Sequence, residues 1–151
     1  METRRVVTCF LAHRGKILIV RRSEKVGTYR GKWSAISGHV EKPPEEQARQ
    51  EIREEAGLAP GDFRLLYAGE TLEVVDRHEN IRWIVHPFLF EIGDPVKVRL
   101  DWENVEARWI MPSELTRFDT VPKLKEALQN VMDAETKRDA VRSKQKHRQN
   151  P

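Results

Sequence analysis

The sequence has little cysteine, no long hydrophobic run and no N-terminal segment of the kind that directs secretion. Cys9 is the only cysteine, so an internal disulfide is excluded, and its apolar surroundings predict a buried thiol in a reducing cytoplasm. No apolar run approaches the roughly 18 residues of a membrane span. The two arginines near the start are not followed by an apolar stretch with a small-residue cleavage site. We therefore expect a soluble globular protein.

Positive charge is concentrated at one end of the chain. The net charge is +3, but residues 137–151 alone contain six Lys or Arg and one Asp, a net charge of +5, which leaves −2 for the rest. Polar basic tails are usually solvating or disordered, and only a minority bind nucleic acid. A chain of 151 residues suits one domain with a sizeable core. We predict this domain at residues 3–133 and a flexible basic tail at residues 134–151.

The pattern of apolar residues predicts an α+β fold with helices packed on a mixed sheet. Two β-branched runs at residues 6–12 and 16–21 are joined by a short turn and predict a hairpin. A glycine-containing loop at residues 23–32 follows. The later segments are predicted as strands at residues 33–37, 63–75, 81–92 and 108–111 and as a helix from residue 122 to about residue 142.

The clearest helix is predicted between Pro43 and Gly57. Two prolines start it, acidic residues follow in its first turn, and glycine ends it. Ala48, Ile52 and Ala56 recur at four-residue spacing and form an apolar stripe.

The same helix carries three glutamates that are candidates for metal binding. Glu51, Glu54 and Glu55 stand at positions i, i+3 and i+4, so their side chains project from one face about 5–6 Å apart at Cβ. Neighbouring carboxylates repel each other unless a cation is present, and hard oxygen ligands suit Mg²⁺ or Mn²⁺. Taken alone, the cluster is equally well explained as a solvated acidic face that pairs with Arg49 and Arg53.

The residues around these glutamates resemble the Nudix box. Gly38-His39-Val40-Glu41 precedes the helix, and residues 50–58 read Gln-Glu-Ile-Arg-Glu-Glu-Ala-Gly-Leu. The family pattern is Gly, five residues, Glu, seven residues, then Arg-Glu-aliphatic-x-Glu-Glu-x-Gly-aliphatic. The hairpin, the Gly-Lys-Trp segment at residues 31–33 and residues 109–115 also look like Nudix proteins. The resemblance covers roughly residues 4–130.

This resemblance implies an α/β/α sandwich and the hydrolysis of a diphosphate bond linked to a variable moiety. It implies that Glu51, Glu54 and Glu55 hold Mg²⁺ or Mn²⁺, with the backbone carbonyl of Ser37 as a further ligand. Such a cation neutralises pyrophosphate oxygens, activates water and stabilises the charge that develops in phosphoryl transfer.

The chain departs from the family pattern at two places. Gln50 stands where the family has arginine, so its hydrogen bonds lack charge assistance. Only 12 residues separate Gly38 from Glu51 where the pattern has 14, and this deletion at residues 41–44 removes the first glutamate of the box. Glu45 and Glu46 are the candidates to replace it.

Several residues outside the helix are further candidates for the active site. Glu103, and with it Glu106, precedes the predicted strand at residues 108–111 and suits a metal ligand or general base; ordinary loop acids are the alternative. For substrate binding we single out Gly38 of the box, the phosphate-clamping candidates Arg21 and Arg22, and Trp33, which can stack on a base. A surface role for the arginines and a core role for the tryptophan stay open.

We therefore expect a Mg²⁺- or Mn²⁺-dependent enzyme that cleaves a diphosphate linkage in a nucleoside diphosphate derivative such as a nucleotide or nucleotide sugar. The alternative is a Nudix-fold nucleotide-binding or regulatory module with little turnover, which Gln50 and the shortened box favour. A further alternative has the basic tail bind RNA. No membrane partner is expected, and a homodimer is as compatible with the sequence as a monomer.

Overall fold

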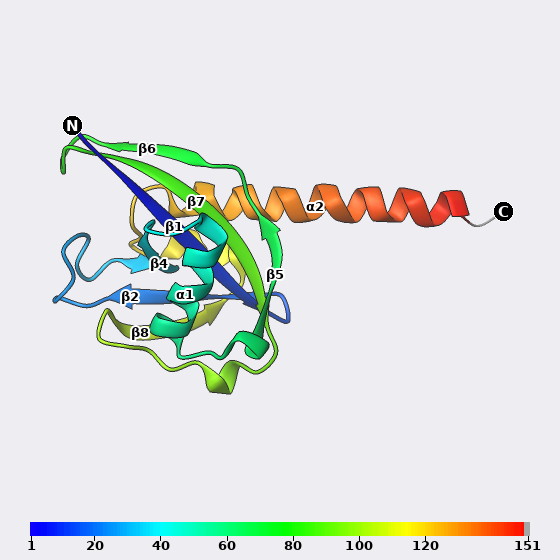
Figure 1. Ribbon diagram of the computed structural model, residues 1–151, viewed down its shortest axis with the longest axis horizontal. Helices are drawn as coiled ribbons and strands as arrows, with labels where there is room; N and C mark the ends of the chain where they lie inside the picture. The colour runs from blue at the N-terminus through cyan, green and yellow to red at the C-terminus, as the bar shows by residue number, and fades with distance from the viewer. Residues whose placement is uncertain (150–151) are drawn as a thin grey trace.

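A computed structural model describes residues 1–149 as a mixed sheet with one α-helix on each face (Figure 1). Among the described residues, no helix is both long and apolar enough to cross a membrane. The helices are α1 (Pro44–Ala56) and α2 (Leu124–Gln149), with short 3₁₀ turns at Pro60–Asp62, Pro95–Lys97 and Pro112–Arg117. The strands are β1 (Glu2–His13), β2 (Lys16–Arg22), β3 (Trp33–Ser34), β4 (Ile36–His39), β5 (Phe63–Ala68), β6 (Leu72–Asp76), β7 (Ile81–Ile92) and β8 (Asn104–Ile110).

Strand β1 is the centre of the sheet. It pairs in parallel with β7 from Glu2↔Ile81 to Ala12↔Glu91, and antiparallel with the short β4 at residues 6–9. Its predicted hairpin with β2 is confirmed, but the two strands pair only beside the turn, at Ala12↔Ile17 and His13↔Lys16. β2 then separates from β1 and pairs with β8 and β3. The opening between β1 and β2 lets β4 and the start of α1 lie in the middle of the molecule.

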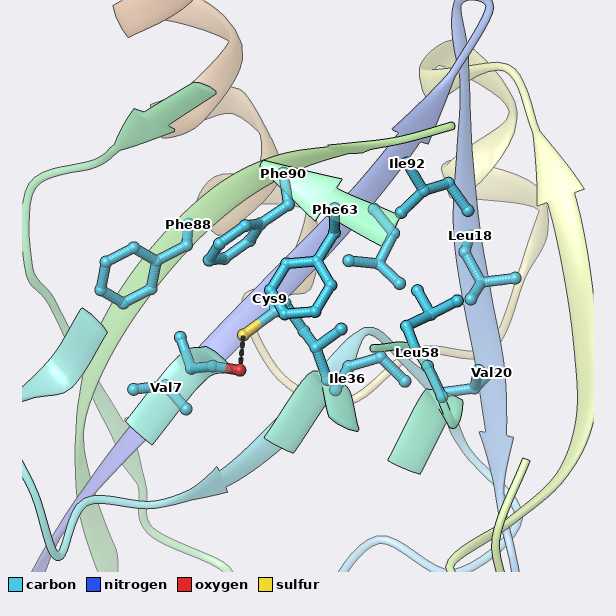
Figure 2. Packing of buried hydrophobic residues seen from close by; sticks show 14 residues of the cluster. Val7, Cys9, Leu18, Val20, Ile36, Leu58, Phe63, Phe88, Phe90 and Ile92 are labelled. Atoms are coloured by element: carbon cyan, nitrogen blue, oxygen red, sulfur yellow. Dashed lines mark hydrogen bonds between the residues drawn. The ribbon is translucent and has the colours of Figure 1, made fainter. Parts of the chain in front are cut away.

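Alternation along the strands divides the core into two layers, which confirms the predicted α/β/α sandwich. Val7, Cys9 and Leu11 face α1, whereas Phe10 faces α2. Figure 2 shows the layer beneath α1, where Phe63, Phe88 and Phe90 gather around Cys9. The Cys9 thiol donates a hydrogen bond to the carbonyl of Ala48 at 3.8 Å, drawn as a dashed line in Figure 2. The other layer is formed by alternate residues of β1, β2 and β7 with α2: Phe10, Ile17, Ile19, Leu89, Leu124, Leu128 and Val131.

Helix α1 forms where the sequence predicts it. Pro44 occupies its first turn, and the backbone of Gly57 ends it in the left-handed conformation, with φ at 67°. A side chain at Gly57 would also place its Cβ 3.2 Å from the carbonyl oxygen of Arg99. Ala48, Ile52 and Ala56 are fully buried against the sheet. Because this apolar face is fixed, the direction of the acidic face is fixed too.

The predicted strand at residues 63–75 is wrong as a single element, because the chain breaks between β5 and β6. At the break, Gly69 donates its N–H to the carbonyl of Pro87, and a Cβ at this position would lie 2.5 Å from Oδ1 of Asn130. The chain therefore passes close to α2 at the break, while β5 and β6 on either side of it both pair with β7. β8 also begins earlier than predicted, at Asn104.

Helix α2 is longer than predicted and extends away from the body (Figure 1). Only its first turns pack on the sheet, through Leu124, Ala127, Leu128 and Val131. Residues 134–149 of the expected tail continue this helix, and residues 150–151 lie outside the described residues. The flexibility of the tail stays a prediction.

Candidate active site

Helix α1 holds its three candidate glutamates at different depths. Glu55 is 3% exposed, Glu51 is half-buried and Glu54 is exposed. This gradient follows from the apolar stripe, because Glu51 and Glu55 flank the fully buried Ile52 while Glu54 stands further round the helix. The cluster therefore reaches from the protein interior to the surface.

Glu55 is a buried carboxylate with two neutral hydrogen-bond donors. The backbone N–H of Ser37 and the side-chain amide of Asn104 both donate to it at 3.2 Å. Burial raises the pKa of Glu55 well above its usual value, and the nearby carboxylates of Glu103 and Glu51 raise that pKa further. Neither donor carries positive charge, so neither forms an ion pair that would stabilise the ionised form of Glu55.

Glu51 lies between the backbone of β4 and a side-chain amide of its own helix. A Cβ at Gly38 would come within 2.2 Å of Cδ of Glu51, so only glycine leaves room for this carboxylate. On its other side, Nε2 of Gln47 donates to Oε1 of Glu51 at 2.9 Å. Burial raises the pKa of Glu51, whereas the hydrogen bond from Gln47 opposes that shift.

Glu54 is held by the residue that departs from the family pattern. Nε2 of Gln50 donates to Oε1 of Glu54 at 2.9 Å, which fixes the orientation of the Gln50 amide. Its oxygen, Oε1, is then buried and has no hydrogen-bond partner among the described residues. A buried acceptor of this kind needs a donor or a cation. The two candidates to replace the missing box glutamate lie elsewhere: Glu45 is bonded to Arg49 at 3.2 Å, and Glu46 is exposed outside the cleft.

The donor set fits a divalent cation in its chemistry. Burial and the neighbouring carboxylates of Glu103 and Glu51 raise the pKa of Glu55, and the unpartnered oxygen of Gln50 lies on the same helix. Across residues 1–149, however, no three His, Cys, Asp or Glu side chains are already gathered in the arrangement of a metal site. Binding would therefore require these side chains to reorient.

Glu51, Glu54 and Glu103 line a cleft of about 470 Å³, within the range typical of small-molecule sites. One wall is the loop at residues 23–32. Tyr29 fixes this loop, since its hydroxyl donates to Asp76 at 2.6 Å and accepts from the indole of Trp83 at 2.9 Å. The lining combines carboxylates, cations and an apolar surface: Glu51, Glu54, Glu103, Arg4, Arg22, Lys25, Lys123, Val6, Leu72, Val74, Trp83, Val85 and Trp102.

The structure separates the two candidate phosphate-binding arginines. Arg22 lines the cleft, and its Nε donates to the carbonyl of Thr28 at 2.9 Å. Burial lowers the pKa of Arg22, while the charges of Glu55 and Glu103 raise it. Arg21 points elsewhere and donates to Glu106 at 3.2 Å. Only Arg22 therefore stands beside the carboxylates.

The remaining candidates also divide into residues that line the cleft and residues that lie outside it. Gly38, Ser37 and Glu103 line the cleft, whereas Glu106 is bonded to Arg21 and Arg108 outside it. Trp33 is 8% exposed and lies in the core, with its ring edge-on to Phe118. Alternation on a short strand explains this position of Trp33.

Sequence reasoning missed two buried polar residues that hold the glutamates, Gln47 and Asn104. Gln47 stands four residues before Glu51, so the helical period offered a signal that the acidic cluster obscured. Asn104 has no local signal in the sequence, because its contact with Glu55 joins distant segments. Trp102 is likewise placed at the cleft, 60% exposed, only by the fold.

The basic residues of the expected tail lie far from this cleft. They occupy the part of α2 that extends from the body (Figure 1). Among those whose side chains the structure describes, the guanidinium of Arg138 lies over the ring of Tyr67 at 5.5 Å. The tail therefore contributes nothing to the site around α1.

Comparison with known proteins gives one family match and many fold matches. The family model of the NUDIX domain matches residues 1–131. A search among curated proteins found no significant match. Among solved structures, a NUDIX hydrolase from Nitrosomonas europaea superposes with a TM-score of 0.70 at 18% identity, covering 88% of this chain and 90% of the other.

Two further structures show the same fold. An Ap4A hydrolase from C. elegans gives a TM-score of 0.70 at 16% identity, with 90% of this chain and 98% of that chain covered. A MutT protein from Methanosarcina mazei Go1 gives 0.67 at 23% identity, with 90% and 96% covered. At such identities these likenesses establish the shared fold alone.

Proposed function

The chain belongs to the Nudix hydrolase family, and on that premise we propose that it uses Mg²⁺ or Mn²⁺ to hydrolyse a diphosphate linkage in a nucleoside diphosphate derivative. The observation that carries the proposal is the composition of the cleft. A carboxylate cluster, cationic side chains and an apolar wall share one cavity. A diphosphate bridged to an organic group needs these three surfaces together.

The cation would be held by Glu51, Glu54 and Glu55, with the carbonyl of Ser37 as a further ligand. Burial and neighbouring carboxylates raise the pKa of both Glu51 and Glu55, and a bound cation would favour their ionised forms, which supports this assignment. When bound, such a cation supplies charge neutralisation for the diphosphate oxygens and lowers the pKa of a bound water.

The other residues of the cleft have distinct proposed tasks. Arg22, held by Thr28, presents a preoriented positive charge to phosphate oxygens. Glu103 lies beside Glu55 and is proposed as general base or additional metal ligand. The apolar wall of Val74, Trp83 and Val85 would exclude water and bind the organic group. Cys9 is a buried free thiol, which agrees with a reducing compartment such as the cytoplasm.

A substrate panel tests this proposal. The protein is incubated with Mg²⁺ or Mn²⁺ and nucleoside di- and triphosphates, nucleotide sugars and, since one structural neighbour is named an Ap4A hydrolase, a dinucleoside polyphosphate. Release of phosphate, pyrophosphate or nucleoside monophosphate that stops on adding EDTA is the expected result. Absence of product from every compound, at protein concentrations up to those of the substrate, would contradict it.

The second candidate is a nucleotide-binding module with little turnover. It is favoured by the neutral Gln50–Glu54 hydrogen bond in place of a charge-assisted one and by the shortened box. Thermal stabilisation by a nucleotide from the same panel, with no product formed, would favour this reading over hydrolysis.

A further inference from the structure

Gln47 is a buried amide at the start of α1 that the proposed chemistry leaves unexplained. It is 3% exposed, although the apolar stripe of the helix does not require a residue there that carries an amide. A buried amide is costly unless its donors and acceptors are bonded. The hydrogen-bond partners of the Gln47 amide therefore indicate its role.

The amide of Gln47 joins two parts of the site. Its oxygen accepts hydrogen bonds from the backbone N–H groups of Glu41 and Lys42, at 3.1 Å and 3.2 Å. Its nitrogen donates to Oε1 of Glu51 at 2.9 Å. The loop between β4 and α1 is thus connected through one side chain to a glutamate proposed to bind the cation.

This connection lies where the box is shortened. Pro43 precedes the helix and offers neither a side-chain cap nor an N–H. In an ordinary capping box a Glu or Gln of the first turn reaches back to the N-cap N–H. Gln47 reaches further back, to Glu41 and Lys42, and so fixes the short loop directly to the helix.

We propose that Gln47 is a positioning residue that orients Glu51 for cation binding and replaces the support lost with the deleted part of the box. The inference rests on the proposed function, since it concerns the same cation site. Glu51 is confined between Gly38 and Gln47, so its carboxylate keeps one orientation, directed from helix α1 into the cleft. Hydrogen bonds from residues behind a metal ligand typically change metal affinity 10–100-fold.

The three hydrogen bonds at this position can be made by glutamine but not by a charged side chain. The side chain must accept from two N–H groups and donate to a carboxylate at the same time. A glutamate cannot donate when ionised, and lysine or arginine cannot accept. An amide also leaves the charge of Glu51 available to a cation, because it is neutral.

Mn²⁺ binding, measured by electron paramagnetic resonance of the free ion, tests the proposal without any substrate. Gln47→Met, which keeps the length but removes the three hydrogen bonds, is expected to bind Mn²⁺ about tenfold more weakly than the parent. The matched control is Gln129→Met, since Gln129 makes the same i to i+4 bond to Asp133 at 2.8 Å on exposed α2. The control should bind Mn²⁺ as the parent does. Affinity of Gln47→Met within twofold of the parent would overturn the proposal.

Turnover and amide exchange separate positioning from a structural role. In Gln47→Met, the Mg²⁺ concentration for half-maximal turnover should rise about tenfold, while KM for the substrate and turnover at saturating Mg²⁺ stay within twofold. Hydrogen exchange at the Glu41 and Lys42 amides should accelerate. If that variant does not fold, Gln47→Asn takes its place, because its shorter amide cannot reach both the loop and Glu51. Parent-like Mn²⁺ affinity in Gln47→Asn overturns the proposal.

Failure of this inference and failure of the proposed function give different results. A parent that binds Mn²⁺ but hydrolyses nothing refutes the function, while the Gln47 variants still test the positioning role. A parent that hydrolyses substrate, with Gln47→Met binding Mn²⁺ equally well, refutes the positioning role alone. A parent that binds no Mn²⁺ refutes both.

Discussion

Helices α1 and α2 pack on opposite faces of the same sheet, but they use their surfaces differently. α1 has 13 residues, of which five are buried, and two of these five, Gln47 and Glu55, are polar. α2 has 26 residues, and the last of its buried residues is Val131, followed by the partly buried Met132 and the contact of Arg138 with Tyr67. One helix is short and constrained on several sides, whereas the other is long and is buried along its first turns.

This difference shows how the fold fixes the directions of the side chains at the candidate site. On α1 the apolar stripe faces the core, Gly57 ends the helix against Arg99, and Gln47 holds its start to the preceding loop. The direction of each glutamate is therefore determined by packing behind it. On α2 beyond Val131, Arg138 contacts the ring of Tyr67, but most of the charged side chains that the structure describes are exposed, which is typical of a solvated surface.

The largest expected effect comes from removing one carboxylate from each helix. Glu54→Gln on α1 should lower turnover at a fixed low Mg²⁺ concentration by at least about a hundredfold, since losing a ligand exceeds the loss of support behind it. Glu126→Gln, on the exposed first turn of α2, should change turnover less than twofold. Initial rates on the best substrate of the panel measure both. Equal rates for the two variants would contradict a cation site on α1.

The next largest expected effect is on the free energy of unfolding. It is found by comparing a buried apolar residue of α1 with an exposed one of α2. Ile52→Ala removes a fully buried side chain and should lower the free energy of unfolding by about 2–5 kcal/mol. Val141→Ala, where the side chain is 54% exposed, should change it by less than about 0.5 kcal/mol. Urea unfolding followed by circular dichroism gives both values. A similar loss in both variants would show that α2 beyond Val131 packs against something.

A smaller effect is expected from the residue that departs from the family pattern. Gln50→Arg supplies Glu54 with a charge-assisted donor in place of a neutral one and should raise turnover a few-fold. Gln129→Arg makes the same exchange beside Asp133 on α2 and should leave turnover unchanged. Steady-state kinetics at several Mg²⁺ concentrations measure the turnover of both variants. A fall in turnover in Gln50→Arg would mean that the unpartnered Oε1 of Gln50 serves the site.

The smallest effect is expected from shortening α2. A chain that ends at Thr136 keeps all the residues of α2 that are buried in the described part of the chain, and it loses the contact of Arg138 with Tyr67, about 0.5–1 kcal/mol. Turnover should stay within twofold of the full chain. A large loss of turnover would assign the extended part of α2 a role in the reaction, and loss of salt-sensitive RNA affinity would support the nucleic-acid alternative.

The sequence predicted those features that depend on neighbours along the chain. Helix α1 was expected between Pro43 and Gly57 and lies at Pro44–Ala56, because proline, glycine and a four-residue apolar spacing act locally. The break at Gly69 was missed, although a glycine inside a strand pattern is a local signal of a bulge or close approach, and its neighbour Asn130 lies on the distant α2. Local pattern carries no information about such a distant neighbour.

The candidate site shows the same limit. The spacing of the glutamates and the small residue at Gly38 were visible in the sequence, as was the departure at Gln50. Arg21 and Arg22 looked equivalent, but strand alternation placed only Arg22 at the cleft. Likewise, the support from Gln47 depends on the conformation of residues 41–42, which a shortened motif does not specify.

The parallel pairing of β1 with β7 has a consequence for how the protein is made. Glu2 pairs with Ile81 and Ala12 with Glu91, so the first strand has no such partner until most of the domain has been synthesised. Contacts this far apart in sequence slow folding, because the loop must close before they form. Helix α1 emerges inside that loop, and Asn104, which bonds Glu55, emerges later still. The glutamates are thus synthesised early, whereas their complete setting is assembled only after the ribosome has passed β8.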